Sequence, residues 1–136
     1  MKLILGVGVA LVAMLGVGWL WGASGRSQID RDLQAAALRG SLVEGRAALL
    51  DARLDIYGIN FGDASRHFEA ARTALRDADA RLNGLGRPDE AKRVELALKR
   101  VDDAQRMAGQ LNQDANALAA EAAKTIDEVI KGTVKR

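Results

Sequence analysis

The chain has 136 residues, with 20 Lys and Arg against 18 Asp and Glu, so it holds at most one small domain with a nearly neutral surface. This balance excludes the strong positive field that nucleic-acid binding needs, and the lack of cysteine excludes disulfides, thiolate metal sites and a cysteine nucleophile. One proline and five aromatic residues beside abundant alanine predict helices rather than sheets.

Residues 3–22 form a run without a charged or strongly polar side chain. As a helix, such a run spans roughly 30 Å, which is the thickness of a bilayer core. Trp19 and Trp21 lie at its end, where indole rings favour the membrane interface. A cleaved signal peptide is the alternative, but its apolar core is shorter, at roughly 7–15 residues. We therefore expect residues 1–22 to be an uncleaved, single-pass transmembrane anchor in contact with the lipid bilayer.

Small residues follow one side of this run, at Gly6, Ala10 and Ala13, and Gly18 and Gly22 form a GxxxG pair at its end. Small residues let two helices approach closely in lipid. We expect this side to pack against the transmembrane helix of another protein subunit. The alternative is that glycine is simply common in membrane spans.

Basic residues flank the run on both sides, with Lys2 before it and Arg26, Arg31 and Arg39 after it. The larger number after the run favours a cytoplasmic C-terminal domain. A short basic tail before a long apolar run is instead typical of a bacterial signal-anchor. We favour the second interpretation, which places the chain in the bacterial inner membrane with its C-terminal domain in the periplasm.

An amphipathic helix is expected over residues 28–57, after a linker at residues 23–27. Gly22 and Gly25 weaken a helix without forbidding it, so direct continuation from the anchor stays open. The apolar positions of the helix form an unbroken heptad seam, and a second apolar stripe beside it gives the width that a bundle helix buries. The seam is Ile29, Leu33, Ala36, Gly40, Val43, Ala47, Leu50, Leu54 and Tyr57, and the stripe is Leu38, Leu42, Leu49 and Ile56.

A second helix is expected over residues 61–83, with Asn60 as its N-cap and Gly84 as its C-terminal cap. The short break before it predicts an antiparallel hairpin with the first helix. Tyr57, Phe61 and Phe68 gather at the tip of this hairpin. They either plug the end of the bundle or form a knob that docks a partner.

A third helix is expected over residues 88–131, with Pro88 in its first turn and residues 132–136 as a tail. Its apolar stripe keeps its phase across Gly109 and Asn112, which favours one long helix. The alternative is a second hairpin near residues 109–113, which gives four helices. One long helix extends beyond the hairpin, and its uncovered apolar residues are then the principal partner-binding element. These residues are Leu111, Leu118, Ile126, Val129 and Ile130.

The sequence contains few residues in the patterns that catalysis or metal binding requires. Asp63 and His67 are spaced to share one face of a helix, but two ligands are too few for a metal site. No serine lies in a nucleophile elbow and no glycine-rich loop follows a strand. We therefore expect no catalytic residue, no metal and no cofactor.

The expected fold is all-α, with a single N-terminal transmembrane helix followed by an antiparallel three-helix bundle, or a four-helix bundle if the last helix turns. The expected function is that of a non-enzymatic accessory or scaffold subunit in a larger bacterial membrane complex. The alternative is a self-associating coiled-coil membrane protein that forms a homo-oligomer.

Overall fold

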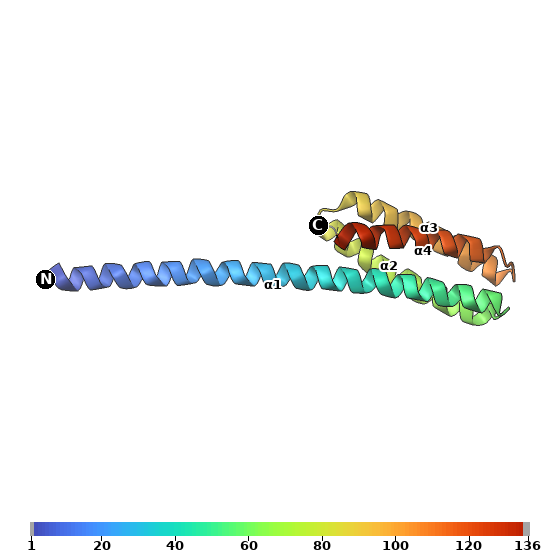
Figure 1. Ribbon diagram of the computed structural model, residues 1–136, viewed down its shortest axis with the longest axis horizontal. Coiled ribbons are helices and arrows are strands. Elements are labelled where there is room, and N and C mark those ends of the chain that lie inside the picture. The colour runs from blue at the N-terminus through green and yellow to red at the C-terminus, as the bar shows by residue number, and fades with distance from the viewer. Residues whose placement is uncertain (1, 135–136) are drawn as a thin grey trace. The chain divides into compact units, whose positions relative to one another are not determined.

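The computed structural model describes the backbone of residues 2–134 and the side chains of residues 28–133. In this part of the chain the secondary structure is entirely helical, which confirms the all-α class. The four helices are α1 (Lys2–Tyr57), α2 (Phe61–Gly84), α3 (Pro88–Gly109) and α4 (Ala115–Val134) (Figure 1). The chain divides into two compact units, Met1–Ala35 and Ala36–Arg136.

The first unit contains the N-terminal part of α1. The backbone is helical through residues 23–27, so the expected linker is a continuous part of α1. The expected anchor at residues 3–22, with its small-residue stripe and its tryptophans, lies outside the residues whose side chains the structure describes. Among the residues that are described, no helix is long and apolar enough to cross a membrane.

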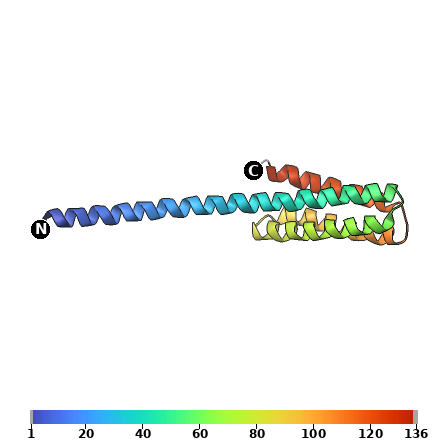
Figure 2. The ribbon, with the colours of Figure 1, turned by 90° about the horizontal axis from the view of Figure 1, so that it is seen from below.

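The second unit is an antiparallel four-helix bundle formed by residues 36–57 of α1 together with α2, α3 and α4 (Figures 1 and 2). The α1–α2 turn and the α3–α4 loop lie at one end of the bundle, and the α2–α3 turn lies at the other (Figure 2). Each helix is linked by polar contacts to the next around the ring, which is the arrangement of an up-down-up-down bundle. The linking contacts are the close approach of His67 to Asp55 and the ion pairs Arg72–Asp102, Arg100–Glu121 and Arg46–Asp127.

One continuous apolar core runs along the bundle, and alanine supplies more than half of its buried residues. Alanine lets helix backbones approach closely but buries little apolar area, and this area is the main source of stability. The larger buried side chains therefore carry most of the hydrophobic stabilisation. They are Phe68, Leu38, Leu42, Leu49, Ile56, Leu75, Leu82, Ile126, Val94, Val101 and Val129.

The heptad seam of α1 does not face the core, and this part of the prediction is wrong. Leu54 and Tyr57 are 68% and 70% exposed, whereas Leu42 and Leu49 of the neighbouring stripe are fully buried. The buried stripe is itself an unbroken heptad pattern: Leu38, Leu42, Gly45, Leu49, Ala52 and Ile56. It faces the core because it offers more leucine and isoleucine to bury, whereas the seam carries alanine and glycine at Ala36, Gly40 and Ala47.

The single helix expected over residues 88–131 is also wrong, because the chain turns between Gly109 and Ala115. The alternative hairpin is the arrangement found. Leu111 has a left-handed backbone, with φ of 58°, and Asn112 N–H donates to the carbonyl of Met107 across 3.0 Å, which closes α3. The apolar phase survives this loop because each helix only needs its own stripe to face the core. α4 then continues through residues 132–134 of the expected tail.

The same closing pattern ends α1, α2 and α3. At the end of α2 the C-cap is Leu85 and the left-handed residue after it is Gly86, with φ of 67°, whereas Gly84, the expected cap, is the last helical residue. At the other two ends the left-handed position is occupied by Ile59 and Leu111. Glycine is the residue that this position favours, so both of these turns are strained.

Candidate interaction surface

Asp63 and His67, the two residues considered as metal ligands, have different partners in the structure. His67 Nε2 lies 3.4 Å from Asp55 Oδ2 of α1, whereas Asp63 pairs with Arg66. Within the described side chains, no three His, Cys, Asp or Glu residues gather closely enough to hold a metal ion. The Asp63–His67 pair therefore forms no candidate metal site.

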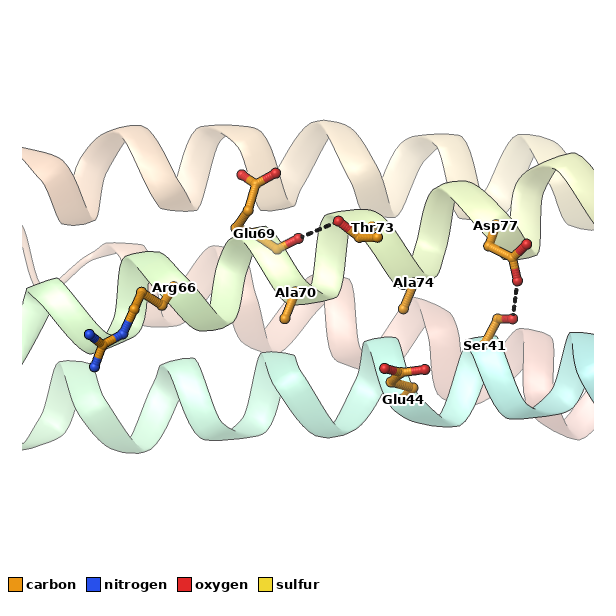
Figure 3. A pocket seen from close by; sticks show the side chains of 8 residues that line it. All are labelled: Ser41, Glu44, Arg66, Glu69, Ala70, Thr73, Ala74 and Asp77. Carbon is orange, nitrogen blue, oxygen red and sulfur yellow. Dashed lines mark hydrogen bonds between the residues drawn. The ribbon is translucent and has the colours of Figure 1, made fainter.

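A shallow groove, open to solvent, lies between α1 and α2 (Figure 3). At one end of it, Asp77 accepts hydrogen bonds from the Ser41 hydroxyl and from Arg81 Nε, the latter across 2.7 Å. Both hydrogen bonds lower the pKa of Asp77, and the bond from Arg81 has the larger effect. The Asp77 carboxylate therefore stays ionised and acts as a hydrogen-bond acceptor. The groove is lined by Ser41, Glu44, Arg66, Glu69, Ala70, Thr73, Ala74 and Asp77.

The charged groups of this groove are mostly engaged with neighbours on their own helix. Glu69 pairs with Arg72, and Arg66 pairs with Asp63. The Thr73 hydroxyl donates to the carbonyl of Glu69 across 3.1 Å (Figure 3). Such groups stabilise a helix surface and present no activated base or nucleophile. The groove is therefore ordinary bundle surface.

The aromatic residues expected at the hairpin tip are separated by the fold. Phe68 is fully buried in the core, Phe61 is half-buried against it, and Tyr57 is 70% exposed. Phe68 and Phe61 thus serve as a plug at this end of the bundle. Tyr57 alone points away from the core.

The expected partner-binding residues of the C-terminal helix do not form a free surface. Ile126 and Val129 are buried in the core, and Leu118 and Ile130 are half-buried against it. Leu111 is exposed in the α3–α4 loop. The hairpin folds α4 back onto the bundle, so the overhanging helix on which this expectation depended does not exist.

The exposed apolar residues gather instead on the side of α1 that faces away from the core. We call this side the α1 outer face; in the second unit it comprises Ala36, Gly40, Val43, Ala47, Leu50, Leu54 and Tyr57. All of these are exposed except Leu50, which is half-buried. Ile29 and Leu33 continue the heptad pattern in the first unit and are also exposed. An exposed apolar stripe like that of the second unit is typical of interaction surfaces.

Charged side chains border the α1 outer face, acidic on one side and basic on the other. Glu44 and Asp51 follow directly after Val43 and Leu50, and the basic border consists of Arg39, Arg46 and Arg53. Arg46 Nε lies 3.4 Å from Asp127, and Arg53 Nε donates to Asn116 Oδ1 across 2.7 Å. Within the part of the chain that the structure describes, Arg39, Glu44 and Asp51 form no ion pair. The periodicity of the sequence locates this seam, but periodicity alone predicts that the seam is part of the buried face of α1.

Comparisons with protein families, with curated proteins and with solved structures find no match to this chain.

Proposed function

We propose that this chain is a membrane-anchored, non-enzymatic protein that acts by binding other protein chains, as an accessory or scaffold subunit of a larger bacterial membrane complex. The α1 outer face is the observation that carries the proposal. It is apolar, exposed and bordered by charge, and it replaces the C-terminal helix as the expected binding element.

The membrane part of the proposal rests on the sequence. The apolar run of residues 3–22 is long enough to cross a bilayer, and Trp19 and Trp21 are suited to the interface. The small side at Gly6 and Ala10 is suited to packing against another transmembrane helix. With a bacterial signal-anchor orientation, the four-helix bundle lies in the periplasm.

The absence of catalysis is supported by the polar groups of the bundle surface. His67 faces Asp55 rather than a cluster of ligands, and Asp77 is held ionised by its hydrogen bonds. A carboxylate that is stabilised in this way is a poor proton donor or acceptor near neutral pH. These arrangements favour a structural and binding role.

Self-association is the second candidate, and one specific observation favours it. The exposed stripe of α1 is an unbroken heptad pattern, which is the pattern by which helices of like sequence pair. The two candidates use the same surface and differ in the identity of the partner.

Native gels of membranes solubilised in mild detergent test the proposal. We expect the wild-type chain to migrate as a species larger than its monomer. Leu54→Glu on the α1 outer face should shift it towards the monomer, because a charge in an apolar interface is unfavourable. Leu96→Glu is the matched control, since Leu96 is an exposed leucine on α3. Migration of the wild-type chain only as a free monomer would contradict the proposal.

A further inference from the structure

We propose that the α1 outer face binds a second copy of this chain, parallel and in register, as a two-stranded coiled coil over residues 36–57. The inference rests on the proposed function, because it names the partner of the same surface. The proposed dimer also has a defined orientation and register of its two α1 helices, neither of which follows from the proposed function alone.

The geometry of α1 allows the helix to serve the bundle and a partner at once. In heptad notation, Gly40, Ala47 and Leu54 occupy a positions, and the d positions are Ala36, Val43, Leu50 and Tyr57. The residues that pack into the bundle core lie on the other side of the helix, at c positions such as Leu42 and Leu49 and at f positions such as Leu38. Both stripes are unbroken over residues 36–57, so this helix presents one to the bundle core and the other to a partner, with the slight supercoil that a seven-residue repeat requires.

The charges beside the seam select the orientation of the partner. Glu44 and Asp51 occupy e positions, and the g positions are occupied by Arg39, Arg46 and Arg53. In a parallel pair, a g residue faces the e residue of the following heptad of the partner. Arg39 then faces Glu44 of the partner subunit, and Arg46 faces Asp51 of the partner subunit.

An antiparallel pair brings the wrong charges together. There, g positions face g positions and e positions face e positions, so arginines would oppose arginines and carboxylates would oppose carboxylates. Like charges at such positions destabilise the pair by about as much as opposite charges stabilise it. The charge pattern of this helix therefore fits a parallel copy of itself and disfavours the antiparallel one.

The charges that this pairing uses are available on the surface of the bundle. Arg39, Glu44 and Asp51 are exposed, and they form no ion pair within the described part of the chain. Arg46 is shared with Asp127 of α4, which holds the guanidinium at the edge of the seam. A symmetric dimer contains each interchain pair twice. The pairs of Arg39 with Glu44 and of Arg46 with Asp51 therefore give four ion pairs in all.

The seam is short, but it is already ordered. An isolated helix of about this length is marginal in water, and pairing must normally supply the free energy that orders it. Here α1 is held as a helix by its buried stripe, so association does not carry this entropic penalty. In a parallel pair, the N-terminal ends of both 36–57 segments lie at the same end of the coiled coil. Two chains that are anchored in one membrane require this arrangement.

Disulfide cross-linking of the full chain in native membranes tests the proposal, because the natural chain has no cysteine. Val43→Cys and Leu50→Cys each place one thiol at a d position, where only a parallel, in-register pair brings it next to itself. A disulfide needs a Cα–Cα separation of roughly 4.4–6.8 Å. In an antiparallel pair, at most one residue along the helix meets its own copy, so cross-linking of both variants distinguishes the two orientations.

We expect both variants to give a dimer as the main oxidised species, and Leu96→Cys on exposed α3 to give only background. Yields for Val43→Cys and Leu50→Cys that do not exceed that background would overturn the proposal. Cross-linking of one d-position variant alone would overturn the parallel register.

Charge reversal provides the second measurement, in the Val43→Cys background. Arg39→Glu puts like charges opposite Glu44 of the partner subunit and should lower the cross-linked fraction about fivefold. Adding Glu44→Arg restores opposite charges and should recover the yield. A loss without recovery would overturn the pairing of these two positions.

The outcomes separate this inference from the proposed function. If cross-linking fails while Leu54→Glu still releases the chain from a larger species, the partner is a different protein and only the inference falls. If cross-linking succeeds in a chain that an alkaline wash removes from the membrane, the dimer stands and the proposed anchor falls.

Discussion

Gly45 of α1 lies so close to Leu75 of α2 that a side chain added at Gly45 would force the Leu75 side chain to move. A Cβ atom at Gly45 would lie 2.7 Å from Cδ2 and 2.8 Å from Cγ of Leu75, and Leu75 is fully buried. Ser41 and Asp77 are hydrogen-bonded one helical turn from this contact. The absence of a side chain at Gly45 thus sets how closely α1 approaches α2.

We predict that Gly45→Ala destabilises the bundle. Overpacking of a core typically costs about 1–3 kcal/mol, of which the higher helix propensity of alanine recovers up to about 1 kcal/mol. Gly62→Ala is the control, since Gly62 is exposed in α2 and nothing lies within 4 Å of the position that its Cβ would take. Gly62→Ala should be neutral or stabilising. Thermal unfolding of the full chain in detergent compares the two, and equal effects would contradict the close contact with Leu75.

We predict that replacing either strained residue at the helix ends by glycine stabilises the bundle. Ile59 and Leu111 are exposed and have φ of 59° and 58°, a region that costs an L-residue roughly 1–2 kcal/mol. Ile59→Gly and Leu111→Gly should each relieve this strain and raise the free energy of unfolding. The gain is limited to about 1 kcal/mol, because glycine also increases the conformational entropy of the unfolded chain. Gly86→Ala at the equivalent position should have the opposite effect. A lower stability for both glycine variants would show that their apolar side chains matter more than their backbone strain.

We predict that acid weakens the contact between α1 and α2 through Asp77. The hydrogen bonds from Arg81 and Ser41 lower its pKa below the ordinary aspartate value of 3.8. A group whose pKa is lower in the folded state contributes stability above its unfolded pKa, and this is lost as the pH falls through the folded pKa. The stability difference between wild type and Asp77→Asn should therefore be constant near neutral pH and shrink below about pH 4. Unfolding midpoints at pH 7 and pH 3 measure it, and a difference that persists in acid would contradict this role.

We predict that removing residues 111–136 unfolds the whole second unit. Truncation deletes α4, whose Ile126 and Val129 are buried in the shared core, and it removes the ion pair of Asp127 with Arg46. The apolar side of the α1–α2 hairpin that α4 covered is then exposed to water. The small apolar area that the alanine-rich core still buries cannot compensate for this loss of stability. Circular dichroism of the truncated chain should show loss of a cooperative transition. A stable remaining hairpin would contradict a single shared core.

We predict that a charge in the centre of the apolar run prevents membrane insertion. Ala13→Arg should cost about 2.5–3.5 kcal/mol on insertion scales. Ala80→Arg, at an exposed position of α2, is the control and should leave the chain in the membrane pellet. If Ala13→Arg still sediments fully with membranes after an alkaline wash, residues 3–22 are not the anchor.

The helical class and most of the helix ends follow from the amino-acid sequence alone. α1 ends at Tyr57, α2 begins at Phe61 and α3 begins at Pro88, all as predicted. These features are local: a glycine-containing break and a proline act within one turn of the chain. Asn60 precedes α2 as expected but makes no side-chain capping hydrogen bond, and its amide donates to the Asp63 carboxylate instead. Local rules also identified both apolar stripes of α1 and left the second hairpin as an alternative.

Which of these surfaces is buried depends on how all four helices pack together. Two stripes of α1 have equally regular spacing, and the stripe with Leu42 and Leu49 is the buried one because it carries more leucine and isoleucine than the seam. Likewise, helical phase alone did not reveal that the chain turns at Leu111, since a folded-back α4 covers the core that an extended helix would leave open. Periodicity identifies an apolar side of a helix, but the choice of neighbour depends on every other surface that the chain has to bury.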